Sequence, residues 1–179
     1  MKKLFFLVMT FLSILGYGQN LSLSELISLR KMSLEDTETY LTNKGWNYKE
    51  GEEETNEKLG SLTFVYGTNG DYEYAQSFLN KYYSSYVVEN RISIQTNKQS
   101  KYLEYLNAVK GFNAILIFTG TIDGNLIKVY QGATLTFIFK TGTSNNSLGD
   151  TKSMWVLNIW TNEDYDSMLP FNKKTESEI

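Results

Sequence analysis

The sequence predicts an α+β fold in which a unit of helix and four-stranded antiparallel meander occurs twice, with the helices packed on one face of the sheet. The first observation is a nearly constant offset between similar positions: Leu41 and Leu106 are 65 residues apart, as are Ile94 and Ile159. The second is that a long strand-like stretch follows each helical stretch. The third is that the predicted strands are joined by short connections, which favours antiparallel neighbours. A shared offset at several positions indicates a tandem duplication.

The chain opens with a pattern typical of a secretory signal peptide. Lys2 and Lys3 precede an apolar run over residues 4–15, and Gly16 and Gly18 offer small residues for cleavage. The run is shorter than the ~20 residues that a spanning helix needs, so we expect residues 1–19 to be removed and no membrane insertion afterwards. Without any cysteine the chain has no lipid attachment site and no disulfide. We therefore expect a secreted or periplasmic protein.

The first repeat is predicted over residues 22–96. Ser22 and Glu25 have the spacing of a capping box, and Ser33 begins a second helix that ends at Gly45, where a left-handed residue is favoured. Strands follow over residues 46–50, 59–66, 72–83 and 87–96, with an acidic loop over 51–58. Only the last strand alternates cleanly, with Ile92 and Ile94 on its buried face.

The second repeat is predicted over residues 97–161. Its helix begins after Thr96 or Asn97 and ends at Gly111, and strands follow over 112–121, 126–130, 133–140 and 154–161. We take Gly111 as the equivalent of Gly45, and Trp46 and Phe112 as equivalent core residues. Residues 20–161 would then form a single duplicated domain, and the polar residues 162–179 a frayed tail.

At the level of this pattern the chain resembles the β-lactamase inhibitory protein, a tandem helix-plus-four-strand repeat, and the single-unit SmpA/OmlA outer-membrane lipoproteins. It is also similar to small exported bacterial proteins of unknown function in which a serine-capped helix ends in Lys-Gly-Trp, here Lys44, Gly45 and Trp46. The resemblance covers residues 22–161 and implies the fold, but it transfers no binding residue.

Composition excludes several classes of site. The chain has no histidine and no cysteine, which removes Ser-His-Asp and Cys-His catalysis, structural zinc and histidine-held haem. No phosphate-binding loop is present, so we expect no cofactor. The net charge of −3 favours neither nucleic acid nor anionic lipid. The acidic run over residues 50–57 offers oxygen ligands for calcium, but it lacks the spacing of a calcium loop, and a solvated loop is favoured.

Aromatic residues on the sheet give the candidate partner-binding site. If Ile159 is buried, the pleat turns Trp160 to the face opposite the helices. If the paired Val65 and Val129 are buried, Tyr66 and Tyr130 turn to that face as well. We therefore predict that Tyr66, Tyr130 and Trp160 lie partly exposed on a partner-binding face. The alternative is that they only pack on their cross-strand neighbours or under the tail.

These observations predict an exported, non-enzymatic binding module, either a protein inhibitor or an envelope assembly factor. Its partner would be another protein of the envelope. An alternative is a carboxylate-based hydrolase acting on an envelope polymer, since acid pairs alone can hydrolyse glycosidic bonds. A third possibility is a purely structural surface protein.

Overall fold

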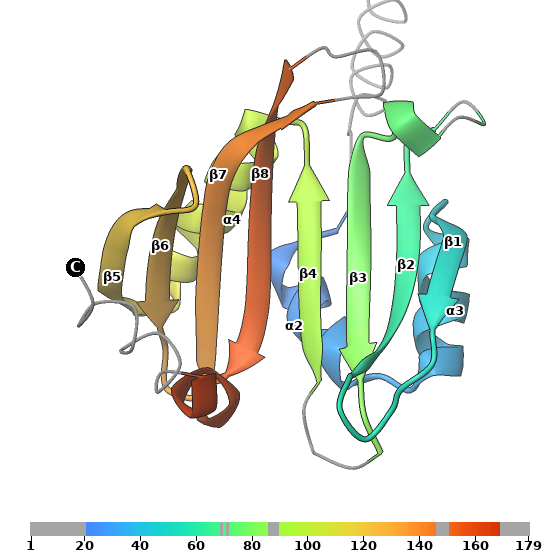
Figure 1. Ribbon diagram of the computed structural model, residues 1–179, viewed down its shortest axis with the longest axis horizontal. Coiled ribbons are helices and arrows are strands. Elements are labelled where there is room, and N and C mark those ends of the chain that lie inside the picture. Colours follow the sequence, from blue (N-terminus) through green and yellow to red (C-terminus); the bar gives the residue numbers. More distant parts are fainter. Residues whose placement is uncertain (1–20, 69, 71, 86–89, 146–150, 169–179) are drawn as a thin grey trace, which may run out of the picture.

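The computed structural model describes residues 21–68, 70, 72–85, 90–145 and 151–168. This part of the chain has an α+β fold built on an antiparallel sheet of eight strands, in the order β1-β2-β3-β4-β8-β7-β6-β5 (Figure 1). The predicted signal peptide over residues 1–19 lies outside the described residues. None of the described helices is long and apolar enough to cross a membrane.

The helices precede the strands in each half of the chain. These helices are α2 (Leu23–Lys31), α3 (Leu34–Asn43) and α4 (Gln99–Gly111), and residues 162–168, after the last strand, are also helical. The strands are β1 (Asn47–Glu52), β2 (Gly60–Tyr66), β3 (Ser77–Tyr83), β4 (Arg91–Thr96), β5 (Ile115–Ile122), β6 (Asn125–Gln131), β7 (Leu135–Asn145) and β8 (Thr151–Thr161). The predicted strand over residues 72–83 starts later than expected, because the short helix η2 (Tyr72–Tyr74) precedes it.

The hydrogen-bonded register can be followed outward from the middle of the sheet. In the first half, Ile94 pairs with Leu79, Leu79 with Phe64, and Phe64 with Tyr48. Directly after Tyr48 the pairing shifts by one residue, so Lys49 occupies a β-bulge on the edge strand β1.

The register of the second half follows the same pattern from the central strand β8 outward to β5. Ile159 pairs with Phe137, Phe137 with Tyr130, and Tyr130 with Leu116. Directly after Leu116 the pairing shifts in the same way, so Ile117 occupies a β-bulge on the opposite edge strand, β5. The strand order is also mirrored about the central pair, β4 and β8.

One hydrophobic cluster joins the helices to the sheet. We call the sheet face that carries this cluster the core face, and the opposite face the open face. Helix α2 packs on β4, α4 on β8 and β4, and α3 on β1, and Figure 1 shows the strands in front of these helices. The cluster includes Leu26, Leu29, Leu41, Trp46, Phe64, Leu79, Ile92, Ile94, Tyr105, Val109, Tyr130, Phe139, Leu157 and Ile159.

Capping residues fix the two N-terminal helices as expected. The Ser22 N–H donates to Glu25 Oε2 at 2.7 Å and Ser22 Oγ accepts from the Glu25 N–H at 3.3 Å, which confirms the capping box. Ser33 Oγ accepts from the Asp36 N–H at 3.0 Å. Neither residue predicted to cap α4 is its N-cap; that position is Lys98, whose N–H donates to Thr96 Oγ1.

The ends of α3 and α4 differ from the expected equivalence. Gly45 follows α3 with φ of +80°, but Gly111 is the last helical residue of α4, and the left-handed residue after that helix is Asn113, with φ of 57°. Gly111 therefore does not have the left-handed conformation after the helix that was expected from its comparison with Gly45. Trp46 is 1% exposed, as expected of a core residue, but Phe112 is 56% exposed, because it is the C-cap residue and precedes the turn that brings the chain back to the sheet.

A buried lysine interrupts the core face of β3. Lys81 is 1% exposed, and its ammonium group donates to Leu29 O at 2.7 Å and to Met32 O. Carbonyl groups at the end of a helix lack intrahelical partners, so the lysine satisfies the C-terminal end of α2. Burial, and then the nearby charge of Arg30, lower the pKa of Lys81 to about 8.

Candidate interaction surface on the open face of the sheet

The centre of the open face is an uncharged polar row on four neighbouring strands. Thr63, Asn80, Ser93 and Asn158 occupy successive cross-strand positions on β2, β3, β4 and β8. Thr63 Oγ1 donates to Asn80 Oδ1 at 2.8 Å, and Ser93 is 7% exposed. The row alternates with core residues such as Phe64, Leu79 and Leu157. Pleat alternation therefore turns these four side chains away from the core.

Trp160 lies beside this row, on the same face of β8, and is partly exposed. The Arg91 guanidinium lies 4.4 Å from the centroid of the indole ring, and the Tyr165 ring meets it edge-on at 6.5 Å. The predicted position of Trp160, opposite the core face and partly exposed, agrees with the structure.

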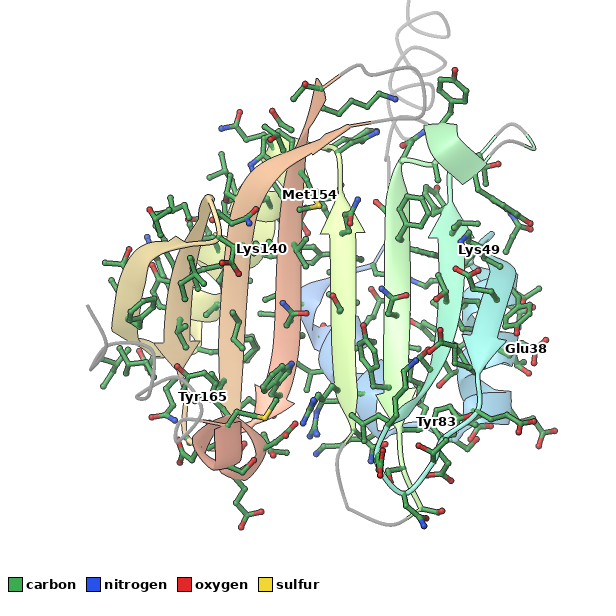
Figure 2. The ribbon with its side chains drawn as sticks, in the orientation of Figure 1. Glu38, Lys49, Tyr83, Lys140, Met154 and Tyr165 are labelled. Atoms are coloured by element: carbon green, nitrogen blue, oxygen red, sulfur yellow. The ribbon has the colours of Figure 1, made fainter. Side chains whose placement is uncertain are left out.

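The arginine that contacts Trp160 is held by a nearly buried carboxylate. Arg91 Nε and Nη2 donate to the two oxygens of Asp164 at 2.6 and 2.5 Å, and Asp164 is 4% exposed. Asp164 belongs to helical residues 162–168, and its N–H donates to Thr161 Oγ1. Residues 162–168 are therefore not the frayed tail that was expected, and residues 169–179 lie outside the described part. We call Trp160, Arg91, Asp164 and Tyr165 the Trp160 cluster (Tyr165 is labelled in Figure 2).

Tyr66 and Tyr130 are not on the open face, so this part of the prediction is wrong. Tyr130 is 6% exposed and its ring meets Phe139 edge-on within the core, at 5.9 Å between centroids. Tyr66 is partly exposed but packs against the core cluster, with its ring 5.3 Å from that of Trp46. The structure therefore brings neither tyrosine to Trp160.

The prediction for Tyr66 and Tyr130 depends on the assumption that a buried Val65 and a buried Val129 lie on the core face. Val65 and Val129 are 0% and 3% exposed, yet they lie outside the core cluster, at positions that alternate with it. Each is paired with a large apolar neighbour, Phe78 for Val65 and Ile138 for Val129. Cross-strand neighbours cover a short branched side chain completely even on an open face, so its burial does not identify the core face.

Two aromatic residues of the open face were not assigned from the sequence. Phe78 and Tyr82 alternate with the core-face residues Leu79 and Lys81 on β3, and both are partly exposed. The pattern of β3 was undecided because a charged residue occupies a buried position. Tyr82 pairs with Arg91, which places it next to the Trp160 cluster.

The acidic residues near β1 form local pairs. Lys58 contacts Glu52, Lys49 contacts Glu50, and Glu54 accepts from the backbone and side chain of Ser85. No group of three metal-binding side chains exists among the described residues. Hydrogen bonds from Ser85 lower the pKa of Glu54, which is the opposite of what a general acid requires.

No family model matches this chain, and neither a curated protein nor a solved structure matches it. The resemblance to repeat proteins therefore rests on the pattern of elements, and the open face has to be interpreted from its own residues.

Proposed function

We propose that the protein is a non-enzymatic binding module that binds another protein through the Trp160 cluster and the adjoining polar row. The observation that carries this proposal is the placement of Trp160. Its large aromatic side chain is partly exposed on the open face, opposite the face that carries the core cluster.

The chemistry of the surface supports a protein partner. Tryptophan, tyrosine and arginine are the residues that most often dominate the binding energy of protein interfaces, and here Trp160, Tyr82 and Arg91 lie together. The polar row offers hydrogen-bonding groups without a fixed charge. Because Arg91 is held by Asp164 on one side and stacks on Trp160 on the other, binding would cost little side-chain entropy.

We propose further that the fold arose by tandem duplication, with its helices on one face of the sheet. The register supports this proposal: when Ile94 and Ile159 are taken as equivalent, both β-bulges fall at equivalent positions, Lys49 and Ile117. The same alignment makes Asn113 the equivalent of Gly45, and both have positive φ. Superposing residues 33–96 on 98–161 in an experimental structure tests it, and bulges that fail to overlay would refute it.

Export is part of the same proposal. We propose that residues 1–19 are a cleaved signal peptide and that the partner is a protein of the cell envelope. N-terminal sequencing of the protein from its native cells tests this proposal, and an uncleaved product that fractionates with membranes would contradict it.

The binding experiment compares two tryptophans of the same strand. Trp160 is on the open face, whereas Trp155 packs against the core cluster. The wild-type chain is used to capture a partner from the native envelope, and the affinity of that partner is then measured for Trp160→Ala and Trp155→Ala. We expect Trp160→Ala to weaken binding by ~2 kcal/mol, about 30-fold in Kd, because it removes a central aromatic anchor.

The control separates binding from folding. Trp155→Ala should lower stability but leave the affinity of the folded fraction unchanged. Unchanged affinity in Trp160→Ala, or equal losses in the two variants, would overturn the assignment of binding to the open face.

A further inference from the structure

The two edges of the sheet have opposite chemical character. Among the described residues, seven of the twelve exposed large apolar side chains lie between residues 112 and 126, on or next to β5. They are Phe112, Ile115, Leu116, Ile117, Phe118, Ile122 and Leu126, with exposed fractions from 36% to 71%. Strand β5 contains no charged residue. An edge strand has unpaired backbone groups, so this is an exposed, apolar pairing edge.

The opposite edge, β1, has the features that normally prevent such pairing. Its sequence includes Lys49, Glu50 and Glu52, and the lysine occupies the β-bulge. Charged residues and bulges on edge strands protect a sheet against association with another chain. At the equivalent bulge position of β5 the residue is Ile117, which is 46% exposed. Both edge strands therefore have a β-bulge, but only β1 has a charged residue in it.

We propose that β5 is a homodimer interface at which the β5 strands of two copies of this chain pair in antiparallel orientation. Two uncharged apolar strands can pair without placing like charges opposite each other. Because the charged β1 edge is a poor partner for β5, the contact is between identical edges. Such a contact closes as a symmetric dimer, whereas β5 pairing with β1 would build an open chain of molecules.

The exposed area is sufficient for a stable contact. With roughly 200 Å² for each fully exposed large side chain, the exposed fractions of the seven side chains amount to about 700 Å² per copy. The largest apolar patch on a typical monomer is about 300–600 Å², and a standard interface buries ~800 Å² per partner. Backbone groups of β5 and the exposed Thr119 and Thr121 contribute the remainder.

Sedimentation equilibrium of the full chain tests the dimer and its position. We expect association at micromolar concentrations, with a dissociation constant of about 1–100 µM. Ile117→Lys transfers the residue of the protected edge to the equivalent position on β5, and it should weaken the dimer at least 100-fold while thermal unfolding stays cooperative. Thr39→Lys, on the exposed side of α3, adds the same charge elsewhere and should leave the dimer unchanged.

Cross-linking locates the contact independently, because the chain has no cysteine of its own. A two-fold axis brings only the residues close to it next to their own copies, so single cysteines are placed in turn at Thr119 and at Thr121. At least one of them should form a disulfide-linked dimer under mild oxidation, and Glu50→Cys on β1 should not. A monomer throughout the concentration range would overturn the proposal, as would equal cross-linking at β1. Dimerisation only after removal of residues 169–179 would also overturn it, since the tail would then be what covers β5.

Discussion

Glu25 connects the first two helices, and its charge should be a measurable source of stability. It accepts hydrogen bonds from the Ser22 N–H at 2.7 Å and from the Tyr40 hydroxyl at 2.5 Å, and it forms an ion pair with Lys44. Partial burial raises the pKa of Glu25, but the hydrogen bonds from Lys44, Ser22 and Tyr40 together outweigh it and lower the pKa from 4.5 to about 2. Replacing Glu25 by glutamine keeps the size of the side chain and removes the charge.

The magnitude follows from the change in pKa. A carboxyl group whose pKa falls from 4.5 to about 2 on folding gains at most ~3 kcal/mol of stability at neutral pH. The Glu25 side chain is 27% exposed, so solvent screening reduces this to about 1–2 kcal/mol. Because the pKa is lowered in the folded state, this stability is present above pH 4.5 and is lost as the pH falls towards 2.

Urea unfolding of the wild type and of Glu25→Gln at a series of pH values measures this contribution. We expect the variant to be less stable by about 1–2 kcal/mol at pH 7 and the difference to vanish near pH 2. Glu38→Gln, on the exposed side of α3 (Glu38 is labelled in Figure 2), should have little effect at any pH. If Glu25→Gln loses the same stability at pH 2 as at pH 7, the cause is the altered shape of the side chain and the electrostatic reasoning is wrong.

Four further substitutions, at Lys81, Gly45, Gly111 and Asp164, test the packing. Lys81→Met should cost about 2–3 kcal/mol in urea unfolding, because the carbonyls of Leu29 and Met32 lose the hydrogen bonds from the ammonium group, and Leu29 O keeps only the one from the Met32 N–H. The lowered pKa of Lys81, about 8, adds a pH dependence. Between pH 8 and 10 the lysine keeps its proton in the unfolded state and loses it in the folded state, so the stability of the wild type should rise relative to that of the variant. Gly45→Ala should lower the stability by about 1 kcal/mol, because Gly45 has a positive φ that alanine adopts only with strain. Gly111→Ala should instead raise the stability by a few tenths of a kcal/mol or more, because Gly111 is helical and has open space around it. Equal effects of the two substitutions would contradict the assigned helix ends. Asp164→Asn should cost about 2–4 kcal/mol and alter tryptophan fluorescence, because Arg91 loses a nearly buried partner; unchanged thermal unfolding would contradict this.

The parts of the fold that could be predicted from sequence are those governed by local chemistry. Ser22 and Ser33 cap helices through contacts within four residues, and the strict alternation of Ile92 and Ile94 leaves one choice of buried face. The eight strands were identified with shifted ends, since strand ends depend on which neighbour pairs with them. The placement of Trp160 on the open face could be predicted from the same alternation, because Trp160 directly follows the buried Ile159.

The parts that could not be predicted depend on distant partners. Lys81 is buried because two carbonyls at the end of α2 accept from it, and they are about fifty residues away. Its charge concealed the core face of β3 and with it Phe78 and Tyr82. Val65 is buried by a cross-strand neighbour, and that register is not encoded within β2 itself. Asp164 is paired with Arg91, which lies 73 residues earlier in the sequence at the start of the neighbouring strand β4, so nothing near Asp164 in the sequence indicates the ion pair.

The two proposed surfaces are compatible with each other and are linked by symmetry. An antiparallel pair of identical β5 strands requires a two-fold axis perpendicular to the sheet. Such an axis keeps the same sheet face up in both copies, so the two Trp160 clusters would point in one direction and β5 pairing would cover neither. A dimer of this form could bind two copies of a partner displayed on one envelope surface. Two linked sites can raise the apparent affinity by about 10²–10⁴ without any new contact, so modest binding at each open face would be sufficient for stable attachment.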